Sequence, residues 1–395
     1  MEHPGQTSIT RHFAALPDPR VERTKAHRLL DIISVALCAV VCGADSWVAI
    51  EAFGRAKEAW LRTFLALPGG IPSHDTFGRV FARLDPAAFG RCLLTWAQAS
   101  APGRATPHTE RLRALDGKTL RGSQDRPRGK AALHLVSAWA SEAGLVLGQV
   151  AVDDKSNEIT AIPELLRLLA LAGCTVTIDA LGGQTAIAAQ SIAQEGDYVL
   201  ALKDNHATLH AEVQWTFAAA RADDFATYAP ADDDYARTVD KDHGRLAIRR
   251  HWTLDDAALL AYLDPSGAWA GLHGIGLVET ERHCEEIVSS ETRYYLLSTR
   301  TGAAAFGRAV RSHWGIENRV HWVLDVTFGE DAYQVRVGHG AQNLAVLRHL
   351  ALNLLRQEHS LRGSLPTKRF TAALDDTYRA QVVAPLLADF PTVRE

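Results

Sequence analysis

The order of apolar runs after Arg111 constrains the fold of this chain more than any other feature of its sequence. Three short runs rich in β-forming residues come first, and a segment with apolar residues at three-to-four spacing follows them. A four-residue run, a second helical segment and a last β-rich run complete the series. In chain order the segments are 112–116, 132–140, 145–152, 159–172, 175–178, 184–194 and 198–202. The pattern therefore predicts the order β-β-β-α-β-α-β.

This order is that of a ribonuclease H-like fold. We therefore expect an α/β protein whose core is a mixed five-stranded sheet with flanking helices. In such a sheet the first and the fourth strands are neighbours. The segments 112–116 and 175–178 are accordingly expected to end side by side.

Flanking segments differ in character from this core. Residues 1–104 carry five helical patterns and predict an all-helical N-terminal domain, joined to the core through 102–108. Alternating apolar and polar residues at 236–254, 274–282 and 292–298 predict a β-rich insertion. The expected division is a helical domain at 1–104, the first part of the core at 105–205, the insertion at 206–300, the C-terminal helical part of the core at 301–360 and a tail at 361–395.

Composition and charge exclude several classes of protein. The longest apolar run, Leu29 to Ala44, contains Asp31 and is too short to cross a bilayer. Five scattered cysteines, an odd number, predict neither a disulfide framework nor a zinc knuckle. We therefore expect a cytoplasmic protein.

The net charge of -4 argues against a DNA-binding role, but residues 101–130 hold eight basic against three acidic residues.

Three acidic residues form the candidate catalytic centre. Asp116 and Asp179 each end one of the two neighbouring strands. Glu317 lies in the helical segment that follows the insertion, between two tryptophans, where we expect it to be buried. Carboxylates from separate segments that converge on one edge can hold two Mg2+ or Mn2+ ions for phosphodiester chemistry. An aspartate before a glycine at a strand end is more often a turn residue. The prediction therefore depends on the joint pattern and not on any one residue.

Histidines beside the glutamate raise a zinc alternative. His313, Glu317 and His321 are spaced i, i+4 and i+8 and share a helix face. A zinc site would need further ligands, and no second cluster of His and Cys supplies them. We therefore expect the two histidines to orient Glu317 or to contact phosphate.

Candidate DNA-binding residues are basic side chains near these acids or on the insertion, and each has a plainer explanation. A helix that Ser73 or Asp75 can cap, and that presents Arg79, is either a recognition helix or an ordinary capped core helix. Lys203 is either a phosphate contact or a solvated lysine, and the insertion strands carry either a positive DNA-binding face or a charged edge. The candidates are Arg79, Lys118, Arg121, Lys203, His243, Arg245, Arg249, His313, Arg319 and His321.

An ordered series of motifs over nearly the full length resembles a known family, the bacterial insertion-sequence DDE transposases of the ISAs type, which include the H-repeat-associated proteins. The motifs that carry the resemblance are Leu16-Pro-Asp-Pro-Arg, Gly70-Ile-Pro-Ser-His-Asp-Thr-Phe, Asp116-Gly-Lys-Thr-Leu-Arg-Gly-Ser, Lys155-Ser-Asn-Glu-Ile, Ala201-Leu-Lys-Asp-Asn, Asp242-His-Gly-Arg and His313-Trp-Gly-Ile-Glu-Asn.

The resemblance implies that Asp116, Asp179 and Glu317 are the DDE triad, and that the helical N-terminal domain is associated with DNA binding. Related transposases place Tyr, Arg and Lys at fixed distances from the glutamate. This sequence has Val310, His313 and Leu324 there, so those contacts do not carry over. His313, Arg311 and Arg319 are the candidate substitutes.

The expected function is Mg2+-dependent cleavage and strand transfer at the ends of an insertion sequence. Expected partners are double-stranded DNA, as terminal inverted repeats and target, and a second copy of the chain in a synaptic complex. Two alternatives stay open at this point. One is a catalytically silent DNA-binding descendant, and the other is a metal-dependent nuclease that does not join strands.

Overall fold

A computed structural model describes residues 8–101, 111–152, 158–180, 182–228, 234–242, 245–284 and 287–387 of the chain. The expected linker at 102–108 and the candidate His243 lie outside the described residues. Within those ranges, no helix has both the length and the apolar character needed to cross a membrane. All five cysteines are free, as expected.

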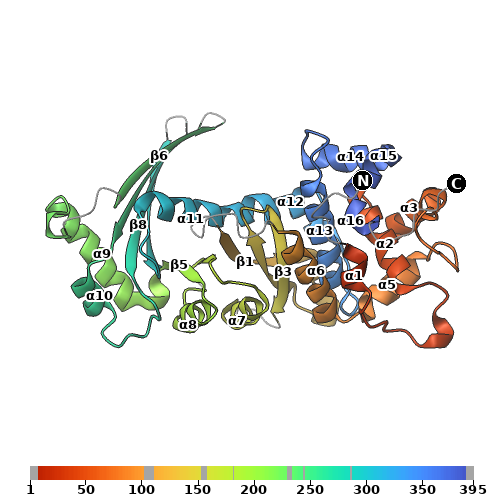
Figure 1. Ribbon diagram of the computed structural model, residues 1–395, viewed down its shortest axis with the longest axis horizontal. Coiled ribbons are helices and arrows are strands. Elements are labelled where there is room, and N and C mark those ends of the chain that lie inside the picture. Colours follow the sequence, from red (N-terminus) through yellow and green to blue (C-terminus); the bar gives the residue numbers. More distant parts are fainter. Residues whose placement is uncertain are drawn as a thin grey trace.

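One large mixed sheet runs through the molecule (Figure 1). The described residues form nine strands in the spatial order β3-β2-β1-β4-β5-β9-β8-β7-β6. β1, β4 and β5 are parallel, whereas every other neighbouring pair is antiparallel. Their bounds are β1 Leu112–Leu120, β2 Leu133–Ala140, β3 Leu145–Val152, β4 Thr175–Ile178, β5 Asp197–Leu202, β6 Tyr235–Asp242, β7 Arg245–Leu254, β8 Gly274–Cys284 and β9 Ile287–Leu297.

The prediction that the first and fourth strands are neighbours in the sheet is confirmed. β1 pairs with β4 in parallel, and the last partners in the register are Leu115 and Ile178. Asp116 and Asp179 each follow the last paired residue directly. The expectation that β1 ends at Asp116 is wrong, because its pairing with β2 continues as far as Leu120.

Helices cover both faces of the sheet (Figure 1). α7 (Glu158–Leu168) and α8 (Thr185–Ala193) lie on one face, and α11 (Ala303–Ile316) crosses the other. α11 contacts strands from β6 at one end of the sheet to β1 near the other, because its buried residues Phe306, Ala309 and Val310 recur at helical spacing. A single helix therefore ties the outer strands to the strand that carries Asp116.

The residues between β5 and α11 extend the core sheet, because β9 pairs directly with β5. They also contain two helices that the sequence analysis did not predict, α9 (Ala207–Ala222) and α10 (Ala257–Leu263). α9 buries Val213, Thr216, Phe217 and Ala220, which have helical spacing. Only two of these four are large and apolar, so the periodic signal in the sequence is weak.

Helices from both ends of the chain pack together at one end of the molecule, where α13 joins them to the sheet (Figure 1). α2 is buried on nearly every side and packs on α13. α14, α15 and α16 return to the N-terminal helices. The remaining bounds are α1 Ile9–Phe13, α2 Leu29–Val41, α3 Trp47–Ala56, α4 Glu58–Leu61, α5 His74–Arg83, α6 Pro86–Ser100, α12 Trp322–Val326, α13 Gly340–Gln357, α14 Leu365–Leu374, α15 Asp376–Val382 and α16 Ala384–Leu387.

Two fully buried asparagines anchor α13. Asn343 donates to the carbonyls of Phe81 and Leu84 at 2.7 and 2.9 Å, which fixes α13 to the end of α5. Asn353 accepts from the Val146 amide at 2.9 Å and donates to the Val146 carbonyl at 2.8 Å, which fixes α13 to β3. Buried polar groups of this kind are costly to leave without a partner.

We predict that Asn353→Ala lowers the free energy of unfolding by about 2 kcal/mol or more, because it leaves both backbone groups of Val146 buried without a partner. Urea denaturation followed by circular dichroism measures the change. Gln357→Ala, at the less buried end of the same helix, is the control and should change stability by less than about 0.5 kcal/mol. Equal effects of the two substitutions would contradict the anchoring role.

Candidate active site

The two aspartates reach the site from adjacent strands. Asp116 lies in β1 at the point where pairing with β4 stops, so its side chain is free of that neighbour strand. Asp179 follows β4 immediately, and its Oδ1 accepts a hydrogen bond from the Gly182 amide at 3.3 Å. Their positions follow from the register of the two strands.

Glu317 reaches the site from the opposite face of the sheet. α11 ends at Ile316, and residues Glu317–His321 form a π-helical turn before α12. Single π-turns inside α-helices shift the side chains that follow them and often occur at functional sites. Here the turn lets His321 Nδ1 approach Glu317 Oε2 to 3.0 Å.

The expectation that Glu317 is buried between two tryptophans is wrong. Its side chain is 55% exposed, and Trp314 and Trp322 are themselves exposed. The physical reason is that α11 turns its apolar face to the sheet and its end toward an open cavity. Glu317 therefore lies at the mouth of that cavity and not in the core.

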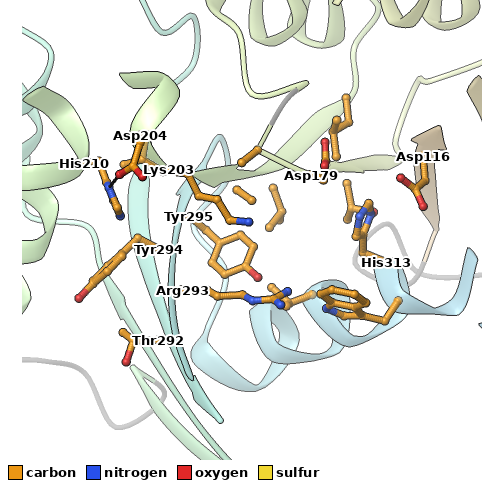
Figure 2. Close-up of a pocket in the computed structure, with 18 of the residues that line it drawn as sticks. Asp116, Asp179, Lys203, Asp204, His210, Thr292, Arg293, Tyr294, Tyr295 and His313 are labelled. Carbon is orange, nitrogen blue, oxygen red and sulfur yellow. Dashed lines mark hydrogen bonds and ion pairs between the residues drawn. The ribbon is translucent and has the colours of Figure 1, made fainter. Parts of the chain in front are cut away.

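A cavity of about 550 Å³ brings the three acids together. Its wall includes Asp116, Asp179 and Glu317. Figure 2 shows Asp116 and Asp179 near His313 on one side, with Lys203 and Arg293 extending toward the interior from other strands. Acidic groups therefore line one part of the cavity and basic groups another.

His321 lies buried between two of these carboxylates. Its Nδ1 is 3.0 Å from Glu317 Oε2 and 3.4 Å from Asp116 Oδ2. Burial alone would lower the pKa of His321, but hydrogen bonds to Asp116 and Glu317 outweigh burial and raise this pKa to about 9. The hydrogen bond from His321 also lowers the pKa of Glu317. The pKa of Asp116 falls as well, because His321 more than offsets the opposing effect of its burial.

The pKa of Asp179 is shifted in the opposite direction. Burial raises its pKa, against the hydrogen bond from Gly182, and the nearby charges of Glu158 and Asp116 raise it further. Ionising a carboxyl group in such surroundings costs free energy, and an added cation would reduce that cost. The acidic wall is therefore suited to positive charge.

His313 places an uncharged imidazole in the wall of the cavity. Its Nδ1 lies 3.2 Å from Thr177 Oγ1, on the strand that leads to Asp179. Burial lowers its pKa, which outweighs the opposing effect of Asp116 and Asp179. The imidazole is therefore uncharged near neutral pH and can accept or donate single hydrogen bonds.

The donor atoms fit a divalent cation. One ligand atom from each of Asp116, Glu317 and His321 lies within 4.8 Å of the others. Asp179 lines the same cavity. A set dominated by carboxylate oxygens suits Mg2+ or Mn2+ better than zinc, which prefers nitrogen and sulfur.

Lys118, a predicted phosphate contact, forms ion pairs within the protein. Its side chain is only 10% exposed, and its Nζ pairs with Asp325 and lies 2.8 Å from Glu330 Oε2. Burial lowers the pKa of Lys118, but the two acids outweigh it and raise that pKa. The ammonium of this lysine joins β1 to the segment after α12, and its phosphate contact stays a prediction.

The other predicted basic residues fall into separate groups. Lys203 lines the cavity with the three acids, and Arg249 and Arg319 line a second hollow beside it. Arg121 is exposed and lies 3.6 Å from Asp331. Arg79 is exposed on α5, which is capped by Ser73, one of the two caps that the sequence allowed. The side chain of Arg245 lies outside the described residues.

Sequence reasoning missed two residues at the site, Glu158 and Arg293. Glu158 Oε1 lies 2.7 Å from His134 Nε2, at the start of α7. A Cβ on Gly117 would lie 2.1 Å from the same oxygen, so a larger residue there would displace this carboxylate. Glu158 belongs to the Lys155 motif, which was the one signal that pointed to it. Arg293, in an alternating strand, carried no such signal.

The fold and the site define an α/β protein with an acidic centre, and comparison with known proteins gives its family. Residues 107–354 match the family described as "Transposase DDE domain", and residues 10–97 match one described as "DDE_Tnp_1-associated". The first match covers more than half of the sequence. The chain therefore belongs to the DDE-domain transposase family, which confirms the resemblance seen in the motifs.

Similar proteins span nearly the same length. "Putative transposase YncI" of Escherichia coli O157:H7 is 38% identical over 95% of this chain and 94% of its own. "H repeat-associated putative transposase YhhI" of Escherichia coli K12 is 36% identical over 95% of this chain and 97% of its own. "Uncharacterized protein in dhlA 3'region" of Xanthobacter autotrophicus is 46% identical over 72% of this chain and 92% of its own.

A solved structure, the piggyBac transposase synaptic complex with hairpin DNA, is also similar. It has 10% sequence identity and a TM-score of 0.41, covering 95% of this chain and 77% of that one. This likeness is too low to support an argument about fold. Strand order and register are the better guide.

We predict that Lys118→Met lowers the free energy of unfolding by about 3 kcal/mol, because it leaves the buried acid Glu330 without its closest cation. Chemical denaturation measures this change. Arg121→Met, which removes an exposed arginine three residues away, should change stability by less than about 0.5 kcal/mol. A stable Lys118→Met protein with weakened DNA binding would instead support the phosphate contact.

Proposed function

We propose that this protein is an active DDE transposase, which cuts DNA at the ends of an insertion sequence and joins those ends to a target. The observation that carries the proposal is that Asp116, Asp179 and Glu317, from three separate segments, line one cavity. Phosphodiester transfer by paired metal ions needs this kind of convergence. Membership of the DDE-domain family supports the same function.

We also propose a ribonuclease H-like core. Two features support it: the order β3-β2-β1-β4-β5, and the antiparallel pairing of the first three strands followed by parallel pairing of β1, β4 and β5. α11 then supplies the glutamate from the opposite face. The strands β6 to β9 form an insertion that continues the sheet beyond β5.

In the proposed mechanism, Asp116, Asp179 and Glu317 would hold the cations. Bound Mg2+, or Mn2+ in its place, would activate the attacking water or 3'-hydroxyl and stabilise the leaving 3'-oxygen. His321 orients Asp116 and Glu317 through its hydrogen bonds. Lys203 and Arg293 bind phosphate oxygens from the other part of the cavity.

DNA is the proposed partner, as terminal inverted repeats and as target duplex. Two ends must be brought together before they are joined to one target. We therefore propose that two copies of the chain act in the synaptic complex. His313 stays neutral there and positions Thr177 and the adjacent Asp179 segment.

We predict that Asp116→Asn and Glu317→Gln each reduce DNA cleavage by more than about 100-fold, since loss of an outer partner of a metal ligand already costs about 10- to 100-fold. The assay incubates purified protein with Mg2+, a target plasmid and labelled DNA taken from the genomic borders of the coding region. Gel analysis then measures nicked and joined molecules.

The matched control is Glu164→Gln, an acid on α7 whose side chain does not line the cavity as the described residues define it. It should cleave like the wild-type protein. Undiminished cleavage by either triad variant would contradict the proposed centre. Nicked molecules without joined ones would favour a nuclease, and DNA binding without either product would favour a silent descendant.

A further inference from the structure

The cavity that Asp116, Asp179 and Glu317 line is called the catalytic cavity below. A second hollow of about 400 Å³ lies beside it. Strands β7, β8 and β9 form one wall, and α11 with the π-helical turn forms the other. We call it the arginine groove, because it is lined by Arg249, Arg282, Arg293, Arg311 and Arg319. Among the residues that the structure describes, the lining of this groove includes none of the three proposed catalytic acids.

The groove adjoins the catalytic cavity. Arg293, Tyr295, Val310 and Trp314 line both hollows. The Arg293 guanidinium lies 4.4 Å from the centre of the Trp314 ring, and its Nε donates to Glu291 Oε1 at 2.6 Å. Figure 2 shows Arg293 among the residues that line the catalytic cavity. The two hollows therefore meet at Arg293 and Trp314, so a bound strand that passes these two side chains reaches from one hollow to the other.

Positive charge exceeds negative charge along this groove. Asp240 forms ion pairs with both Arg249 and Arg311, and Glu291 forms ion pairs with both Arg282 and Arg293. Arg319 adds a fifth, exposed guanidinium. Five arginines against two acids leave an excess of three positive charges. In a chain whose net charge is -4, this local excess marks a surface for an anion.

The guanidinium groups also crowd one another. Burial lowers the pKa of Arg249, and the charges of Arg311 and Arg282 lower it further, against the effect of Asp240. An anion placed among the three groups would relieve this repulsion. The planar fork of arginine fits phosphate oxygens in pairs, so phosphate is the anion that this geometry suits best.

We propose that the arginine groove binds the backbone phosphates of the DNA strand that continues from the scissile phosphate out of the catalytic cavity. This inference rests on the proposed function, because it takes the catalytic cavity as the place where the strand is cut. It goes further by assigning the path of the strand and the residues that hold it. Arg282 and Arg293, neither of which the sequence analysis predicted as a DNA contact, belong to this path together with Arg311.

The test is the salt dependence of DNA binding by the full-length chain. The double variant Arg282→Gln/Arg311→Gln removes two guanidiniums that line the groove and not the catalytic cavity. Arg308→Gln is the matched control, because Arg308 is exposed on α11 and lines neither hollow as the described residues define them. Fluorescence anisotropy of a labelled mixed-sequence duplex with a single-stranded extension, without divalent ions, measures the dissociation constant.

We expect the double variant to bind about 10- to 100-fold more weakly at low salt, because each lost charge-assisted hydrogen bond costs roughly a factor of ten. The slope of log affinity against log salt should become shallower by about 1.5, as two phosphate contacts are lost. Arg308→Gln should match the wild-type protein in both. Unchanged affinity and slope in the double variant would overturn the proposal.

Two further arms keep the test decisive. If the double variant does not fold, Arg319→Gln replaces an exposed side chain and should lower the slope by about 0.7 to 0.9. Nicking with Mg2+ is assayed separately. A wild-type protein that binds DNA through the groove but never nicks it would contradict the proposed function alone, and nicking with an unchanged salt slope would contradict the groove alone.

Discussion

The parallel pairing of β1 with β4 is the constraint on which the rest of the site depends. Four residue pairs, ending at Leu115 and Ile178, set the two strands so that Asp116 and Asp179 both follow the last paired position. Neither aspartate needs a long or flexible loop to reach the site. α11 adds the third acid because its apolar face binds the same sheet from above, which places its end over β1.

Charge is segregated within this small region. Asp116, Asp179 and Glu317 gather negative charge, and His321 partly balances it through two close contacts. Arginines on β7, β8, β9 and α11 gather positive charge only a few side chains away. The π-helical turn connects the two regions, because it carries both Glu317 and Arg319. A near-neutral chain can therefore offer separate surfaces to cations and to a polyanion.

Sequence patterns predicted the core well where the signal was local. The bounds of β4 and the adjacency of Asp116 and Asp179 followed from short apolar runs and their order. Signals that depend on distant partners were missed. β1 is longer than expected because β2 supports it beyond Asp116, and Lys118 is buried because Asp325 and Glu330, two hundred residues later, surround it. Glu317 is exposed because the end of α11 faces an open cavity, which helical spacing alone does not reveal.

The most direct test of the central claim is a crystal structure of the protein grown with Mn2+, with its ions located by anomalous scattering. The account predicts Mn2+ bound by the carboxylates of Asp116, Asp179 and Glu317 in one cavity, and loss of that signal in Asp116→Asn. Ions found only at other residues, or an Asp179 carboxylate that stays out of reach of the bound ions, would contradict it.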